Sequence, residues 1–161
     1  MKKVLIYNFS GELAEITHLF PSERLARIAA IARTAGHDPL IIDRANFSGL
    51  LEFGADFLQH LGDMSYADHD VIYDAQVQRE VDNLVSLAPD LLFLNLWHGA
   101  GFKFSFDLAR ELKAKKPDLQ IFGVGQKVDW FGAHILELEG QAFDGLIMGL
   151  GYAAVECLCA G

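Results

Sequence analysis

The sequence predicts an α/β domain in which a five-stranded parallel sheet carries helices on both faces. Three observations predict this fold: short apolar runs recur along the chain, helical patterns separate them, and several runs end in glycine-rich turns. Strands covered on both faces have continuous apolar runs, and strands that alternate with helices form parallel sheets with right-handed crossovers. The length of the first crossover favours the strand order 2-1-3-4-5.

The expected strands are runs of mainly apolar residues bounded by turn-forming residues. They cover residues 4–7, 40–43, 91–96, 121–124 and 145–148. A first helix is expected over residues 21–32, because apolar residues recur there at positions 25, 28, 29 and 32 and Gly36 follows as a stop signal. Residues 105–116 repeat the pattern, and the lysines near their end favour the negative end of the helix dipole.

The connection between the second and third strands is longer than the others. Residues 44–89 leave room for two helices, which we expect over 46–61 and 71–87 with a turn at 62–65. We therefore expect a single domain over residues 1–161 with a helical insertion around residues 45–88.

Composition excludes several classes of protein. The chain has 161 residues, of which 52% are hydrophobic, and 13 basic against 22 acidic residues give a net charge of −9. This balance argues against a nucleic-acid or anionic-membrane partner, and no apolar run is long enough to span a bilayer. Cys157 and Cys159 stand one residue apart, too close for an unstrained disulfide, so we expect a reducing, cytoplasmic location.

Ligands of open parallel sheets bind at the carboxyl ends of the strands. The loops expected at this edge are residues 8–20, 97–103, 125–131 and 149–153, and they are rich in glycine and aromatic residues. Glycine allows the backbone to approach a ligand closely, although tight strand-to-helix turns also require glycine when nothing binds. Several such loops at one edge favour a ligand crevice.

Several known site motifs are absent or out of place. Gly149-x-Gly151-x-x-Ala154 matches a dinucleotide fingerprint but stands in the last unit of the fold, where no acidic partner can follow. There is no P-loop motif, and Asn8 and Asn95 stand where a phosphoacceptor domain would need acidic residues. The histidines do not cluster at metal-ligand spacing, and His37 is interpreted as a solvent-facing turn residue.

Three stretches of the chain carry a family pattern. They are Pro21-x-x-x-Leu25-x-x-Ile28-Ala29-x-x-Ala32-Arg33-x-x-Gly36-His37-x-x-x-x-Ile42-Asp43, then Ala88-Pro89-Asp90-Leu91, and Phe143-Asp144-Gly145-Leu146-Ile147-x-Gly149-x-Gly151-x-x-Ala154. In order and spacing they resemble the N-terminal cobalamin-binding domain of B12-dependent radical SAM enzymes. That group includes the anaerobic magnesium-protoporphyrin IX monomethyl ester cyclases.

The resemblance implies a flavodoxin-like (Rossmann-like) three-layer sandwich that holds cobalamin at the carboxyl edge of its sheet. It also implies that the chain is a non-catalytic module of a longer radical SAM enzyme, a methyltransferase or a cyclase of the type named above. The C-terminal radical SAM domain of that enzyme would carry the iron–sulfur cluster and S-adenosylmethionine, because the motif Cys-x-x-x-Cys-x-x-Cys is absent here.

The resemblance further indicates which residues contact the cofactor. Asn95-x-Trp97 stands where well-characterised cobalamin modules have Ser-x-Leu, and Gly123-Val124-Gly125 stands where they have paired glycines. The expected cofactor-binding residues are Asn8, Phe9, Asn95, Trp97, His98, Gly99, Gly123, Gly125, Gln126, Gly149 and Gly151. The Asp-x-His-x-x-Gly motif that supplies a cobalt ligand is absent, so we expect no protein ligand to cobalt, with His98 and then His18 as alternatives.

A second interpretation remains open at this point. The chain could be a self-sufficient flavodoxin-like protein that binds flavin or another nucleotide, or a domain that binds a protein partner. Phe9, Trp97, Phe102 and Trp130 could stack on an isoalloxazine ring as readily as they could line a corrin.

Overall fold

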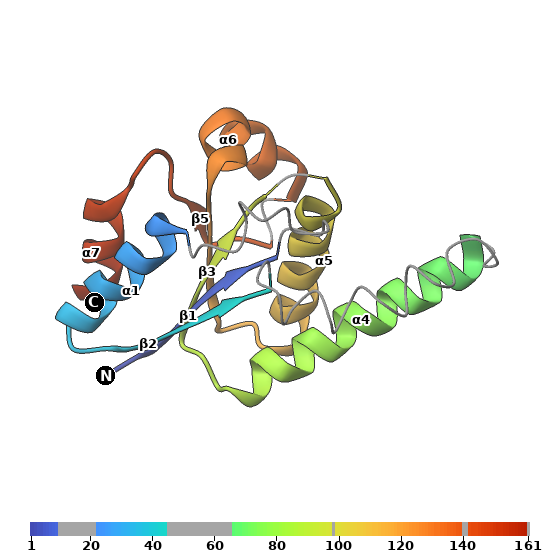
Figure 1. The fold of residues 1–161 in the computed structure, drawn as a ribbon, viewed down its shortest axis with the longest axis horizontal. Helices are drawn as coiled ribbons and strands as arrows, with labels where there is room; N and C mark the ends of the chain where they lie inside the picture. The colour runs from blue at the N-terminus through green and yellow to red at the C-terminus, as the bar shows by residue number, and fades with distance from the viewer. Residues whose placement is uncertain (10–21, 45–65, 98, 140–141, 161) are drawn as a thin grey trace.

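The computed structural model of the chain describes residues 1–9, 22–44, 66–97, 99–139 and 142–160. Five parallel strands form one sheet in the order β2-β1-β3-β4-β5, as the sequence predicted (Figure 1). The strands are β1 (Lys3–Asn8), β2 (Asp38–Asp43), β3 (Leu91–Asn95), β4 (Gln120–Val124) and β5 (Gly145–Leu146). The last strand is shorter than its apolar run, because only its first two residues pair with β4.

Helices cover both faces of this sheet. Those described are α1 (Glu23–Thr34), α4 (Tyr66–Ser86), α5 (Gly99–Lys115), α6 (Gln126–Glu139) and α7 (Tyr152–Ala160). In Figure 1, α1 and α7 lie on one side of the sheet and α4 and α5 on the other. The arrangement is a flavodoxin-like three-layer α/β fold.

The core is divided between the two faces because successive side chains of a strand point in opposite directions. Val4 and Ile6 of β1 pack with the apolar stripe of α1 and with Val155 of α7. Leu5 and Tyr7 pack on the other face with α4, α5 and α6. All five residues of β3 are buried, which explains why its first four residues, 91–94, are continuously apolar.

Two segments expected as loops are helical. Helix α5 begins at Gly99, within the expected loop 97–103, and the buried Ser105 hydroxyl donates to the Gly101 carbonyl one turn earlier (2.8 Å). Helix α6 begins at Gln126 because Val128 and Ile135 share one buried face, and it is kinked at Phe131 (φ −130°, ψ 15°). The helix expected over 46–61, the turn at 62–65 and most of the loop 8–20 lie outside the described residues.

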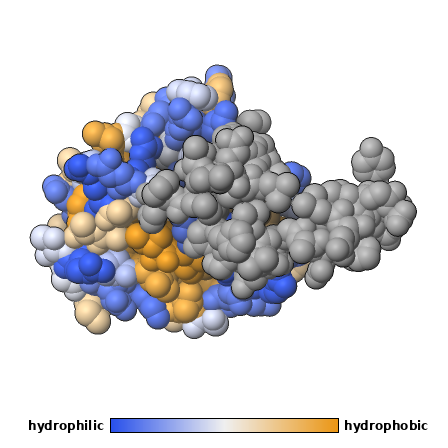
Figure 2. Space-filling model, in the orientation of Figure 1, coloured by the Kyte–Doolittle hydropathy of each residue, from blue (hydrophilic) through white to orange (hydrophobic). Residues whose placement is uncertain are grey.

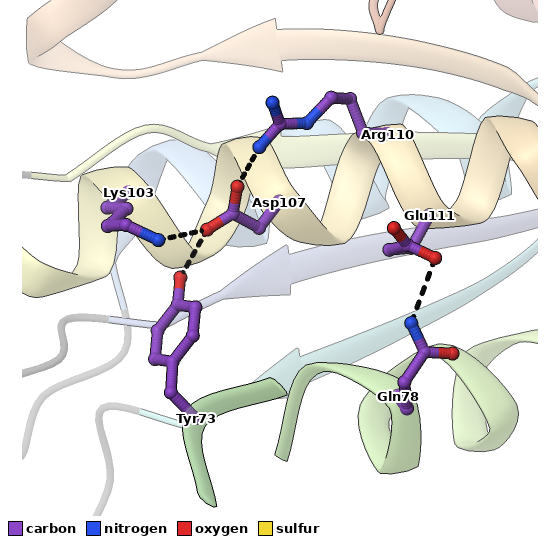
Figure 3. Close-up of polar contacts among 6 residues, drawn as sticks. All are labelled: Tyr73, Gln78, Lys103, Asp107, Arg110 and Glu111. Carbon is purple, nitrogen blue, oxygen red and sulfur yellow. Dashed lines mark hydrogen bonds and ion pairs between the residues drawn. The ribbon is translucent and has the colours of Figure 1, made fainter. Parts of the chain in front are cut away.

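Helix α4 starts earlier than the expected residue 71 and extends beyond the body of the domain in Figure 1. Its second half packs on the sheet through Val77, Val81 and Leu84, all buried. Figure 3 shows the polar contacts that join it to α5: the Tyr73 hydroxyl donates to Asp107 (2.6 Å), and Gln78 donates to Glu111 (2.8 Å). None of the helices that the structure describes is long and apolar enough to cross a membrane.

Strand β2 forms one edge of the sheet and is only half-covered. Leu40 and Ile41 are 40% and 37% exposed, and Figure 2 shows an apolar area on the face where β2 lies. The backbone N–H groups of Asp38 and Arg44 both donate to β1, so the intervening Pro39 lies with its backbone nitrogen toward the free edge. A proline at this position removes one donor from the edge and makes pairing with another strand less favourable.

Candidate functional site

Three polar side chains meet where the neighbouring strands β1, β2 and β3 end. The strand register places Asn8 beside both Asp43 and Asn95. Asn95 Nδ2 donates to Asn8 Oδ1 (2.7 Å), and Asn8 Nδ2 donates to Asp43 Oδ1 (2.9 Å). Asn8 and Asn95 are buried, with 6% and 4% of their surface exposed, whereas Asp43 is half-buried. The amides predicted from the sequence are therefore joined to a carboxylate that the sequence analysis did not single out.

Glycine at the end of β4 is explained by packing within the protein. Gly125 has φ +111°, and a Cβ built there would overlap Asn95 Oδ1 and crowd the Leu96 backbone. Gly123 lies inside β4, and its Cβ would overlap the side chain of Leu146. These two glycines bring β4 close to its neighbours. Gln126, the first residue of α6, is exposed beside them.

The loop between β5 and α7 is held by an acidic residue of α6. Asp129 Oδ1 accepts a hydrogen bond from the Gly149 backbone N–H (2.6 Å), and its Oδ2 pairs with Arg24 of α1 (3.0 Å). Gly149 and Gly151 both have positive φ, and a Cβ on Gly151 would overlap Ile147, whereas a Cβ on Gly149 would meet open space. Asp129 thus fixes the positions of α1, α6 and this loop relative to one another.

Large apolar side chains are exposed on α6 and on the loop that it contacts. The exposed fractions are 59% for Trp130, 45% for Phe131, 59% for Met148 and 65% for Leu150. A Cβ on Gly132 of α6 would lie 3.5 Å from the Met148 sulfur, so helix and loop are in contact. We call these four residues the carboxyl-edge apolar patch. Exposed apolar surface of this kind is typical of a binding face.

A cation borders the carboxyl-edge apolar patch. Lys127 Nζ lies 5.0 Å from the centre of the Trp130 ring and 5.5 Å from the centre of the Phe131 ring. Both distances are within the range of cation–π attraction. Lys127 therefore restrains the two rings at the start of α6 while leaving them partly accessible.

The other expected site residues that the structure describes lie outside the carboxyl-edge apolar patch. Phe9 is half-buried against Phe104, with ring centres 4.5 Å apart, so it belongs to the core beneath α5. Trp97 is half-buried between β3 and α5, and Gly99 is the first residue of α5. His98 and His18, the alternative cobalt ligands, lie outside the described residues. Among the residues that the structure describes, no three His, Cys, Asp or Glu side chains are grouped to hold a metal ion.

An ion pair with one buried partner supports the end of β2. Arg44, directly after Asp43, contacts Glu80 through Nε (2.9 Å) and Nη2 (3.1 Å), and Glu80 is only 1% exposed. The adjacent Tyr7 is completely buried, and this burial together with the Glu80 charge raises the pKa of its hydroxyl well above the usual value. This pair joins the strand end that carries Asp43 to helix α4.

No model of a known protein family matches the chain, and no curated protein is significantly similar to it.

Proposed function

We propose that the chain is the cobalamin-binding module of a B12-dependent radical SAM enzyme, a methyltransferase or a cyclase of the magnesium-protoporphyrin IX monomethyl ester type. The sequence pattern suggests the family. The flavodoxin-like fold is compatible with it, because such sheets bind ligands at the carboxyl ends of their strands.

The carboxyl-edge apolar patch is the observation that carries the proposal. A corrin is a broad ring with apolar faces and a rim of amide groups, so it needs an exposed apolar platform beside polar groups that exchange hydrogen bonds with amides. Trp130 and Met148 offer such a platform, and the Phe131 ring stands at 86° to the Trp130 ring and can border it. Asn95 and Gln126 offer amides near this platform. These groups fit cobalamin in chemical type.

The residues of the chain would bind and orient the cofactor. Trp130, Phe131, Met148 and Leu150 would contact the ring, and Asn95 and Gln126 would contact its rim. The cofactor, when bound, supplies the methyl-transfer or cobalt–carbon chemistry, and the protein supplies position and exclusion of water. A C-terminal radical SAM domain would be the partner that covers the other side of the ring.

Retention of hydroxocobalamin after desalting tests the proposal. The native chain is mixed with hydroxocobalamin, passed through a desalting column and examined by its visible absorption spectrum. We expect co-elution in the native chain and a loss of about tenfold in affinity for Trp130→Ala, because the ring loses its largest apolar contact. Leu136→Ala is the matched control, since Leu136 is also exposed (45%) but lies further along α6.

A flavin in place of cobalamin is the second candidate. The exposed Trp130 ring could stack on an isoalloxazine, but the Asp43 carboxylate at the same edge disfavours the dianionic phosphate of FMN. The same desalting experiment with FMN distinguishes the two cofactors. Retention of FMN without hydroxocobalamin would replace the proposal, and retention of neither would reject both.

A further inference from the structure

The two buried asparagines at the strand ends have a fixed orientation. An ionised carboxylate only accepts hydrogen bonds, so Asn8 must turn its NH₂ group to Asp43 and its carbonyl oxygen to Asn95. Asn95 must then turn its NH₂ group to Asn8. Because one acceptor sets the direction of both amides, Asp43 determines which atom of Asn95 is turned away from Asn8.

That atom is the carbonyl oxygen, Asn95 Oδ1. It lies against the Cα of Gly125, at the end of β4 where α6 begins. Among the described contacts, the Asn95 side chain makes one hydrogen bond, through Nδ2, although it is 96% buried. A carbonyl oxygen at this edge that makes none of these hydrogen bonds can accept one from a ligand or from water.

We propose that Asp43 is a positioning residue that acts through Asn8 to present Asn95 Oδ1 as a hydrogen-bond acceptor, so that the site selects a ligand carrying an N–H donor. The ligand group that fits this acceptor is an uncharged carboxamide, whose NH₂ group can donate to Asn95 Oδ1. A carboxylate at the same position would place a second acceptor against Asn95 Oδ1 and would be rejected. The choice of cobalamin as the ligand rests on the proposed function, whereas the orientation of the amides does not.

The substitution Asp43→Asn should reverse the orientation of both asparagine amides. An amide at position 43 can donate to Asn8 Oδ1, Asn8 can then donate to Asn95 Oδ1, and Asn95 would turn its NH₂ group toward the ligand. The site would change from accepting to donating a hydrogen bond. Asp38→Asn is the matched control, because Asp38 is an exposed residue at the other end of β2 and its loss changes the net charge equally.

Binding of amide and acid forms of one ligand tests this statement. Dissociation constants are measured for hydroxocobalamin and for its separated monocarboxylate derivatives, in which one peripheral amide is hydrolysed. For the native chain and Asp38→Asn, we expect at least one derivative to bind about tenfold more weakly than hydroxocobalamin. For Asp43→Asn, the same derivative should bind as well as hydroxocobalamin or better. A preference unchanged by Asp43→Asn, or no preference in the native chain, would overturn the proposal.

Side-chain amide resonances of ¹⁵N-labelled protein separate this inference from the proposed function. Asp43→Asn should shift the NH₂ resonances of both Asn8 and Asn95, and Asp38→Asn should shift neither. If the native chain binds no hydroxocobalamin, the cobalamin proposal and the ligand class fail together, and the resonances still decide the orientation. Unchanged Asn95 resonances in Asp43→Asn would contradict the role of Asp43.

Discussion

Gly125 lies directly against the side-chain carbonyl of Asn95, at the point where β4 turns into α6. Any other residue at position 125 would place its Cβ on that oxygen, and its backbone would have to keep a φ of +111°. The glycine therefore allows β3 and β4 to approach closely enough to bury Asn95.

Gly125→Ala should consequently be more destabilising than Gly149→Ala. Both positions have positive φ, but a Cβ on Gly149 meets nothing within 4 Å. We expect a loss of about 1–2 kcal/mol for Gly149→Ala from backbone conformation alone, and about 2–4 kcal/mol for Gly125→Ala. Urea unfolding followed by circular dichroism measures both. Equal losses would show that Asn95 moves aside without cost.

Removal of the buried carboxylate on α4 should destabilise the domain strongly. Glu80→Ala leaves the Arg44 guanidinium without the carboxylate that it contacts at 2.9 and 3.1 Å, and also removes the acceptor of Asn83. Because Glu80 is buried but the Arg44 side chain is 21% exposed, the loss should be at most the roughly 3–5 kcal/mol expected for a fully buried pair. The exposed Glu137 pairs with His134 at the surface, and Glu137→Ala should change stability by less than about 0.5 kcal/mol. Similar losses in the two variants would contradict the buried assignment of Glu80.

The Tyr73–Asp107 contact predicts a loss of stability at alkaline pH. Burial of Tyr73, its hydrogen bond to Asp107 and the Asp107 charge raise the pKa of the hydroxyl above the usual value of about 10. The unfolded chain therefore ionises this group first, so its contribution is present below about pH 10 and is lost as the pH rises further. Tyr73→Phe should reduce the fall in the free energy of unfolding above pH 10. Parallel curves for the two proteins would exclude this contribution.

The two cysteines should react at different rates. Cys157 is exposed on α7, whereas Cys159 is 3% exposed and burial raises the pKa of its thiol. A thiol reagent such as Ellman's reagent should label one cysteine rapidly in the folded protein and the second only after unfolding. Rapid labelling of both in the native state would show that α7 detaches from the sheet.

The sequence predicted the sheet well because the signal is local. Continuous apolar runs such as 91–94 can be recognised without knowing their neighbours, and the length of the crossovers then limits the strand order. Once the strand order 2-1-3 is known, the sequence also predicts that Asn8 contacts Asp43 and Asn95. Polar residues end three adjacent strands, and this was the signal that could have identified Asp43.

Other features depend on packing that no local pattern contains. Glycine is needed at positions 125 and 151 because a Cβ there would overlap Asn95 and Ile147, and the loop sequences alone do not indicate these contacts. The interpretation of His37 as a solvent-facing turn residue was wrong. Its Nδ1 accepts the Lys2 backbone N–H (3.2 Å) and its Nε2 lies 2.5 Å from the Cys159 carbonyl oxygen, since the chain termini meet beside it.

The central claim is that the carboxyl edge of the sheet is the cofactor-binding face, and amide hydrogen exchange with and without hydroxocobalamin tests it most directly. Bound cofactor should slow exchange in residues 126–132 and 147–151, which contain the carboxyl-edge apolar patch. Residues 116–120, at the opposite edge of the sheet, should be unaffected. Protection confined to the opposite edge, or no protection anywhere at saturating hydroxocobalamin, would contradict the account.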